Sequence, residues 1–158
     1  MSTSPAPDLQ MGILQRRRIE AEIIKPIYEE MKAAFGAEEK FRLPTPDGKI
    51  GHAEIMIGDS TVMLADENPQ MGARSPQTIG GSPAQFMIYV QDVDTAFPKA
   101  IKAGGTETRP LKDQFYGDRS GTLDDPFGFQ WTLATHVEDV APDEMDRRMQ
   151  EMMKGQGA

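Results

Sequence analysis

A weak internal repeat is the sequence feature that most constrains the fold of this chain. At a constant offset of 69 residues, three pairs of segments correspond: Ala34-Phe35-Gly36-Ala37-Glu38 with Ala103-Gly104-Gly105-Thr106-Glu107, Gly48 with Gly117, and Leu64-Ala65 with Leu133-Ala134. The identities are few, but the offset stays fixed over the length of a module and the order of elements matches. The repeat therefore predicts two similar structural units in tandem.

The second copy shows the order of elements most clearly. Phe86, Ile88 and Val90 alternate with other residues at the period of a strand, and Asp92 can cap a following helix, which Gly104-Gly105 ends. Pro98 predicts a kink or a shifted start in that helix. Three further strands are predicted at Thr106–Pro110, Thr122–Asp124 and Phe129–Thr135, so the module is βαβββ.

The same offset predicts the elements of the first copy. These are a strand near Gln15–Ala21, a helix near Ile23–Phe35, and strands near Glu38–Leu43, Lys49–Ile57 and Thr61–Asp66. The helix is supported by apolar residues that recur on one face. For the first strand an alternative stays open, because residues from Leu9 to Phe35 could form one long helix bent at Pro26.

The predicted fold class is α+β, with two βαβββ modules forming one cupped mixed sheet, helices outside it and a C-terminal helix. The expected divisions are residues 1–67 for the first module, 68–83 for a linker, 84–137 for the second module and 138–158 for an amphipathic helix and tail. The methionine-rich face of the tail is expected to pack on its own domain or on a twin subunit rather than on a foreign partner.

Charge and composition exclude several classes of protein. A net charge of -8 and a pI near 4.8 argue against a nucleic-acid partner, and the isolated cluster Arg16-Arg17-Arg18 does not change this. No run approaches the ~20 apolar residues of a membrane span, and no signal-peptide pattern is present. With no cysteine in the chain, disulfides and thiolate chemistry are excluded, and we expect a cytoplasmic protein.

Three motifs in this order resemble the vicinal oxygen chelate superfamily of glyoxalase, bleomycin-resistance and extradiol dioxygenase proteins. They are Ala34-Phe35-Gly36-Ala37-Glu38-Glu39, Gly51-His52-Ala53-Glu54-Ile55 and Asp125-Pro126-Phe127-Gly128. The run from Gln114 to Leu123, with Trp131 and Ala134-Thr135-His136, is similar to the PhnB-like branch in particular.

The resemblance also implies where a metal would be bound. Carried over to this chain, the four ligand positions are Arg16, Met63, Gln85 and Thr132. Arginine is a fixed cation, methionine a soft thioether and threonine a poor neutral donor, so this set does not suit a hard divalent ion. We therefore expect neither metal nor cofactor, as in bleomycin-resistance proteins that bind a small molecule without transforming it.

Two histidines limit any imidazole chemistry to His52 or His136. In the predicted strand, His52 and Glu54 share the face turned into the cup, about 7 Å apart along the chain. They could act as acid and base, or they could form a polar wall of the pocket. His136 ends the last strand, where a cap or surface role is more common.

The other candidate residues are predicted to bind a ligand. By strand alternation, the side chains that point into the cup include Met63, Gln85, Met87, Tyr89, Gln130 and Thr132. Tyr116 and Arg119, in a predicted loop, could close over the ligand, although Arg119 could instead pair with Asp118 to fix that loop. Trp131 falls between two inward residues and should pack outward in the core.

The sequence thus favours a metal-independent, homodimeric protein that binds a small, partly apolar molecule. An enzyme is the main alternative: a glyoxalase-type lyase or isomerase that uses His52 and Glu54, with a divalent metal in an unusual place. A third hypothesis is an assembly module that dimerises through residues 139–158.

Overall fold

The computed structural model describes residues 25–155, and side chains from residue 29 onward. The strand predicted at Gln15–Ala21, the alternative long helix before Lys25 and the position of Arg16 lie outside the described residues. None of the described helices is long and apolar enough to cross a bilayer.

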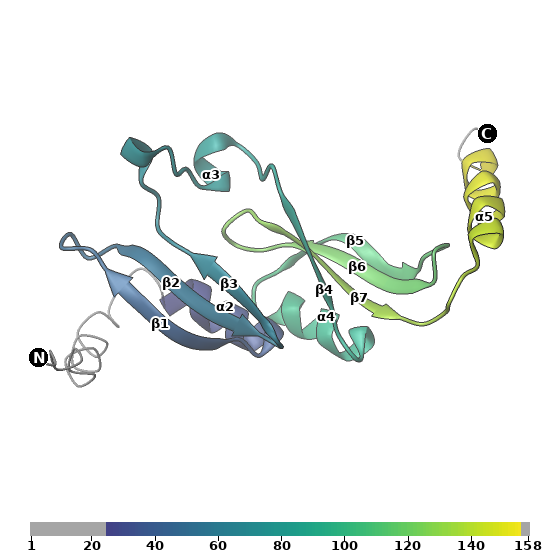
Figure 1. Cartoon of the computed structure of the whole chain (residues 1–158), viewed down its shortest axis with the longest axis horizontal. Helices are drawn as coiled ribbons and strands as arrows, with labels where there is room; N and C mark the ends of the chain where they lie inside the picture. Colours follow the sequence, from purple (N-terminus) through teal and green to yellow (C-terminus); the bar gives the residue numbers. More distant parts are fainter. Residues whose placement is uncertain (1–24, 156–158) are drawn as a thin grey trace, which may run out of the picture.

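The first part of the described chain is a helix followed by a three-stranded antiparallel sheet (Figure 1). The elements are α2 (Lys25–Phe35), β1 (Glu38–Pro44), β2 (Ile50–Ile57) and β3 (Ser60–Leu64), in the sheet order β1-β2-β3. A 3-10 helix at Pro69–Met71 and the short helix α3 (Pro76–Ile79) follow, within the segment predicted as a linker. The module boundaries themselves stay a prediction.

The second part repeats this order with one more strand. Its elements are β4 (Gln85–Tyr89), α4 (Val93–Lys102), β5 (Thr106–Asp113), β6 (Asp118–Asp124) and β7 (Gln130–His136), and β4 pairs parallel to β7 in the sheet order β4-β7-β6-β5. Asp92 caps α4 by accepting a hydrogen bond from the Thr95 amide. Helix α5 (Pro142–Gly155) ends the described chain.

These elements confirm the α+β class, the outer helices and the C-terminal helix. The described strands form two sheets of three and four strands, where the sequence predicted one continuous cupped sheet. Strand bounds also differ: β6 begins at Asp118 rather than Thr122, so Asp118 and Arg119 lie in a strand and not in a loop. The low strand propensity of Asp118-Arg119-Ser120-Gly121 explains the error, because the pairing with β7 overrides it.

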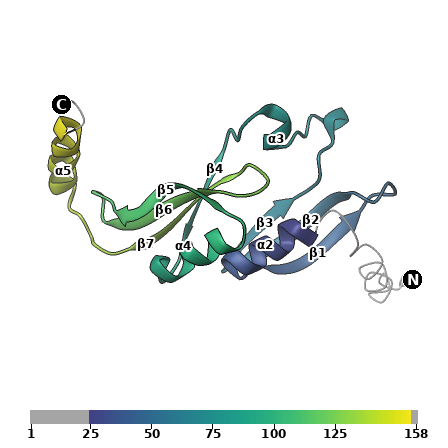
Figure 2. The ribbon, with the colours of Figure 1, turned by 180° about the vertical axis from the view of Figure 1, so that it is seen from behind.

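The two parts share one core. Helices α2 and α4 lie side by side beneath the two sheets, as the two opposite views agree (Figure 2). The buried cluster combines Met31, Ala34 and Ile55 from the first part with Phe97 and Trp131 from the second. The predicted outward packing of Trp131 is therefore confirmed, since its side chain is 4% exposed within this core. Helix α5 stands away from the sheets at the far end of the molecule.

Candidate functional site

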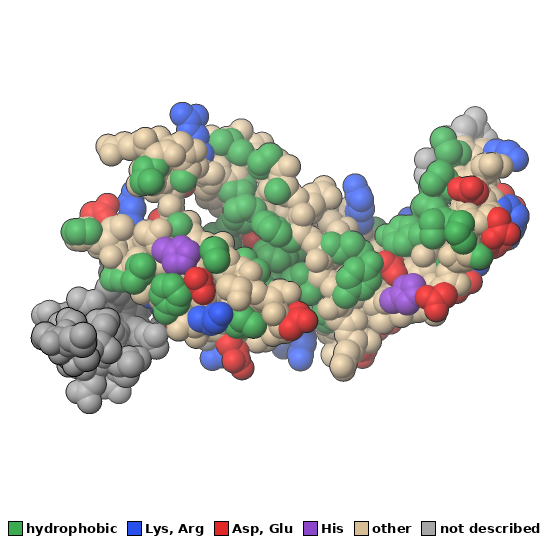
Figure 3. Space-filling view, in the orientation of Figure 1, with side chains coloured by type: hydrophobic (Ala, Val, Ile, Leu, Met, Phe, Trp, Pro, Cys, Tyr) green, Lys and Arg blue, Asp and Glu red, His purple; other side chains and the backbone are tan. Residues whose placement is uncertain are grey.

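The side of both sheets opposite α2 and α4, here called the open face, carries most of the predicted site residues. In β2, Ala53, Ile55 and Ile57 are buried on the helix side, so His52 and Glu54 point to the open face. The same alternation places Met63 on this face in the first sheet. In the second sheet it places Gln85, Met87, Tyr89, Gln130 and Thr132 there. Both histidines are visible on one side of the molecule in Figure 3.

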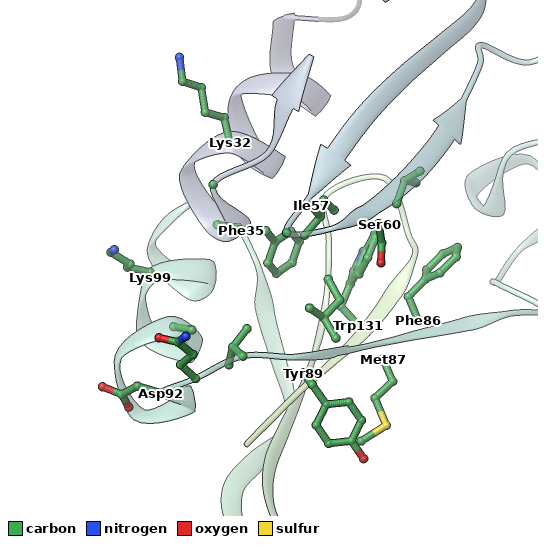
Figure 4. A pocket seen from close by; sticks show the side chains of 18 of the residues that line it. Lys32, Phe35, Ile57, Ser60, Phe86, Met87, Tyr89, Asp92, Lys99 and Trp131 are labelled. Carbon is green, nitrogen blue, oxygen red and sulfur yellow. The ribbon is translucent and has the colours of Figure 1, made fainter. Parts of the chain in front are cut away.

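A cavity of about 860 Å³ lies between the two parts of the chain, bounded by the end of α2, β3 with the turn before it, β4 and the start of α4. Its walls come from both parts of the chain, with Phe35, Ile57 and Val62 from the first and Phe86 and Trp131 from the second (Figure 4). Among the described strands, β3 pairs only with β2 and β4 only with β7, so both strands present a free edge to this cavity.

The cavity gathers only part of the predicted site. Met87 and Tyr89 line it, whereas Met63, Gln85, Gln130, Thr132, Tyr116 and Arg119 do not. Met63, Met87 and Tyr89 are 67%, 46% and 60% exposed, so the open face has no cover from the described residues. A cavity of this size with mostly apolar walls is typical of ligand sites.

His52 and Glu54 are close neighbours, as their shared strand face predicts. The Nε2 atom of His52 lies 3.4 Å from a carboxylate oxygen of Glu54, and Lys40 Nζ lies 3.9 Å from the other oxygen. The ring of Phe41 lies beside the imidazole, with 5.6 Å between ring centroids. An imidazole and a carboxylate in this arrangement could exchange a proton with a bound molecule.

The amide side chains of the second sheet form a chain of hydrogen bonds. Gln85 donates to the side-chain oxygen of Gln130, and Gln130 donates to Asp124 Oδ1 at 2.9 Å. The hydroxyl groups of Thr122 and Thr132 lie 3.0 Å apart. These bonds fix the orientation of Gln85 and Thr132 without using all of their donors and acceptors, so both can still bind a ligand.

A cluster around Asp118 was missed by the sequence analysis. Asp118 is 4% exposed and accepts hydrogen bonds from Tyr89 Oη at 2.7 Å and His136 Nδ1 at 2.9 Å, while His136 Nε2 contacts Asp139 at 2.9 Å. The bond to Asp118, then that to Asp139, raises the pKa of His136 above its usual value. The bond to Asp118 likewise raises the pKa of Tyr89, so its phenol stays protonated. Extending the predicted strand from Thr122 back to Asp118 would have placed both side chains on the same face of the sheet, which could have revealed this cluster.

Arg119 and Tyr116 occupy different surroundings from those predicted. Arg119 pairs with Asp94 of α4 at 2.8 Å and with Asp113 at 3.0 Å, which places its guanidinium on the helix side of the sheet and not beside Asp118. Tyr116 is half-buried against Phe115, in the turn that Gly117 closes with φ +95°. A Cβ at Gly117 would lie 2.0 Å from the Glu138 carbonyl oxygen, so only glycine fits.

The described residues do not suit the metal that the family resemblance implies. Of the four carried-over positions, the three within residues 25–155 are Met63, Gln85 and Thr132, and the amide of Gln85 is already bonded to Gln130. In the same part of the chain, no three His, Cys, Asp or Glu side chains are grouped so that they could hold a metal ion. A hard divalent ion needs several oxygen or nitrogen ligands, which these side chains do not supply together.

Comparisons with known proteins identify the family. Residues 27–133 match the family model of the Glyoxalase/Bleomycin resistance protein/Dioxygenase superfamily, and the chain belongs to this superfamily. An uncharacterized protein of Mycobacterium bovis is 44% identical over 119 residues, which cover 73% of this chain and 78% of that protein. An uncharacterized protein of Mycobacterium tuberculosis has the same identity, with 73% and 70% covered.

Solved structures show the same fold. TioX from Micromonospora sp. ML1 has a TM-score of 0.54 at 24% identity, covering 74% of this chain and 90% of its own. Protein PA1353 from Pseudomonas aeruginosa has a TM-score of 0.57 at 20% identity, with 71% and 88% covered. The fosfomycin resistance protein FosX from Listeria monocytogenes has a TM-score of 0.53 at 13% identity, with 79% and 90% covered. At these identities the likeness concerns the fold alone.

Proposed function

We propose that this protein binds a small, partly apolar molecule along its open face, without a metal ion. The observation that carries the proposal is the combination on β4, where Met87 and Tyr89 are exposed beside the cavity and Gln85 offers an oriented amide next to them. Apolar surface binds the body of a ligand, and a few hydrogen-bonding groups set its orientation.

Metal independence rests on the ligand chemistry of Met63, Gln85 and Thr132, which do not form a shell for a divalent ion.

A PhnB-like relationship, a cytoplasmic location and a homodimer belong to the same proposal. The homodimer is supported by the exposed apolar side chains of the open face and of α5, where Met149, Met152 and Met153 are 41%, 41% and 65% exposed. Apolar groups at this exposure gain from a partner.

The chain's own methionines provide the test. In protein labelled at the methionine methyl groups, NMR titration with benzamide, an aromatic ring with an amide, should shift the signals of Met63 and Met87. Met152 on α5 serves as the control and should not move. Replacing Gln85 with Leu should weaken the binding several-fold, because it removes one hydrogen-bond partner. Unchanged Met63 and Met87 signals up to the solubility limit of benzamide would contradict the proposal.

An enzyme is the second candidate, and the contact between His52 and Glu54 favours it. The 3.4 Å separation lets the carboxylate hold the imidazole in one tautomer, so the other ring nitrogen could act as a base toward a carbonyl substrate. Turnover of methylglyoxal with glutathione, with and without added Ni²⁺ or Zn²⁺, tests it alongside metal analysis of the purified protein. Stoichiometric metal, together with activity that is lost in Glu54→Ala, would favour the enzyme over simple binding.

A further inference from the structure

One buried acid lies at the junction of the two parts of the molecule and takes no part in the proposed binding. Glu30 projects from α2 and is 8% exposed, and its Oε2 atom has no hydrogen-bond partner within the part of the chain that the structure describes. A buried carboxylate without a donor is costly when it is ionised, because it has lost its hydration without a replacement.

A second buried carboxylate acts on Glu30 from the other part of the chain. Asp125, in the turn between β6 and β7, is 6% exposed and accepts hydrogen bonds from the amides of Phe127 and Phe129 and from the indole of Trp131. All three of these donors are neutral groups. Among the charged groups of the described residues, Asp125 is the one whose field raises the pKa of Glu30.

We propose that the protonation state of Glu30 controls how tightly the two parts of the molecule close around the cavity. With Glu30 neutral, α2 packs against α4 and the core continues across the junction. With Glu30 ionised, a buried negative charge lies in the field of Asp125, and its Oε2 atom receives no hydrogen bond from the described residues. The junction then loosens, which opens the cavity between β3 and β4. This regulation acts on the proposed ligand site, so it rests on the proposed function.

The direction of the effect follows from the protonation equilibria. Burial first, and then repulsion by Asp125, raises the pKa of Glu30 from 4.5 to about 7. A junction that opens to water returns the group to its ordinary pKa, so the closed form is favoured by protonation. Between a pH below 4.5 and one above 7, the closed form should lose about 300-fold relative to the open form.

Trp131, the single tryptophan, reports on the junction directly. Its ring lies 5.2 Å from that of Phe35 across the junction, and its indole donates to Asp125 at 2.9 Å. In the full chain, quenching of its fluorescence by acrylamide should rise about twofold or more between pH 5.5 and 8.5, with a midpoint near pH 7. Glu30→Gln should make this quenching independent of pH. Glu29→Gln, an equal change of charge at the exposed neighbouring residue, should behave like the wild type.

The outcomes separate the two proposals. A pH midpoint that persists in Glu30→Gln, or that also disappears in Glu29→Gln, overturns the role of Glu30. If Glu30→Gln does not fold, carbon NMR of the Glu30 carboxyl in the wild type decides, and a midpoint near 4.5 overturns the proposal. If benzamide shifts Met63 and Met87 equally at pH 5.5 and 8.5, regulation fails while binding stands. If benzamide shifts neither signal while Trp131 quenching still follows Glu30, the binding function fails and the pH-dependent junction stands.

Discussion

The central strands of the two sheets occupy equivalent places and carry opposite kinds of side chains. Leu64 of β3 pairs with Ala53 of β2, and Leu133 of β7 pairs with Gly121 of β6. The open-face residues next to these positions are His52 and Glu54 in β2, and Ser120 and Thr122 in β6. The side chains of the first pair are 35% and 18% exposed, while both residues of the second pair are buried.

This difference indicates that the open face of the first sheet can contact a bound molecule, while that of the second sheet mainly stabilises the fold. The first sheet exposes an ionisable pair that could reach a bound molecule, whereas the second sheet buries neutral hydroxyls in hydrogen bonds, such as the one between Gln114 and Ser120 at 3.0 Å. Its ionisable group, Asp118, is also buried and bonded on both oxygens. Changes in β6 should therefore affect stability, and changes at His52 and Glu54 should affect a ligand or a reaction.

The largest effect is expected at Gly121. A Cβ there would lie 2.8 Å from the ring of Phe97, and the helix has little room to move because Phe97 is 4% exposed. Gly121→Ala should lower the free energy of unfolding by roughly 2–3 kcal/mol, the upper part of the usual range for an overpacked core. The reverse change at the equivalent place in the first sheet, Ala53→Gly, should cost only about 1 kcal/mol. Urea unfolding of both variants tests this, and a loss in Gly121→Ala no larger than that in Ala53→Gly would show that the core beside Gly121 has room for a methyl group.

A smaller loss is expected at Asp118. Asp118→Ala removes the acceptor for both Tyr89 and His136, so the free energy of unfolding should fall by about 1–3 kcal/mol. Glu54→Ala, which removes a carboxylate from the open face of the first sheet, should change it by less than about 1 kcal/mol. If Glu54→Ala is the more destabilising of the two, the contrast between the sheets is wrong.

The pH dependence of the second sheet should come from His136. Because its pKa is raised above 6.5 in the folded protein, its two carboxylate partners stabilise the fold fully below about pH 6.5. That contribution is lost as the pH rises through the higher folded value. NMR titration of both imidazoles measures the shift, with unfolded protein as the reference. His136→Asn should abolish this part of the dependence, and a folded midpoint below 6.5 would show that Asp118 and Asp139 do not hold the charge.

The smallest structural effect is expected at His52. His52→Asn should leave the free energy of unfolding within about 0.5 kcal/mol, because the side chain is partly exposed and its contact with Glu54 is long. The same variant should abolish any turnover that uses the imidazole as a base. Retained turnover would remove His52 from the catalytic candidates and leave the binding proposal in place.

Local patterns were enough for much of the fold. Alternating apolar residues predicted β4, and the cap at Asp92 predicted α4. The fixed offset predicted β2 and two similar units, in which the corresponding residues Gly48 and Gly117 have positive φ angles of +83° and +95°. The offset also misaligned one strand, because it made His52 correspond to Gly121. In the sheets it is Ala53 that corresponds to Gly121, since Ala53 pairs with Leu64 and Gly121 pairs with Leu133. A ladder fixes which residues share a face, and a single insertion changes it without leaving a clear mark in the sequence.

The same distinction between local sequence patterns and tertiary contacts applies to the candidate site. Sequence alone determined that Met63, Gln85 and Thr132 stand where the family resemblance would carry metal ligands, and that His52 and Glu54 share one face, because residue type and strand period are local properties. Only the tertiary structure showed that Arg119 pairs with Asp94 on the helix side, and that Asp118 and Glu30 are buried. The burial of an acid depends on which elements pack around it, and those elements are distant in the chain: Tyr89 of β4 donates a hydrogen bond to Asp118, and α2, which carries Glu30, packs against α4.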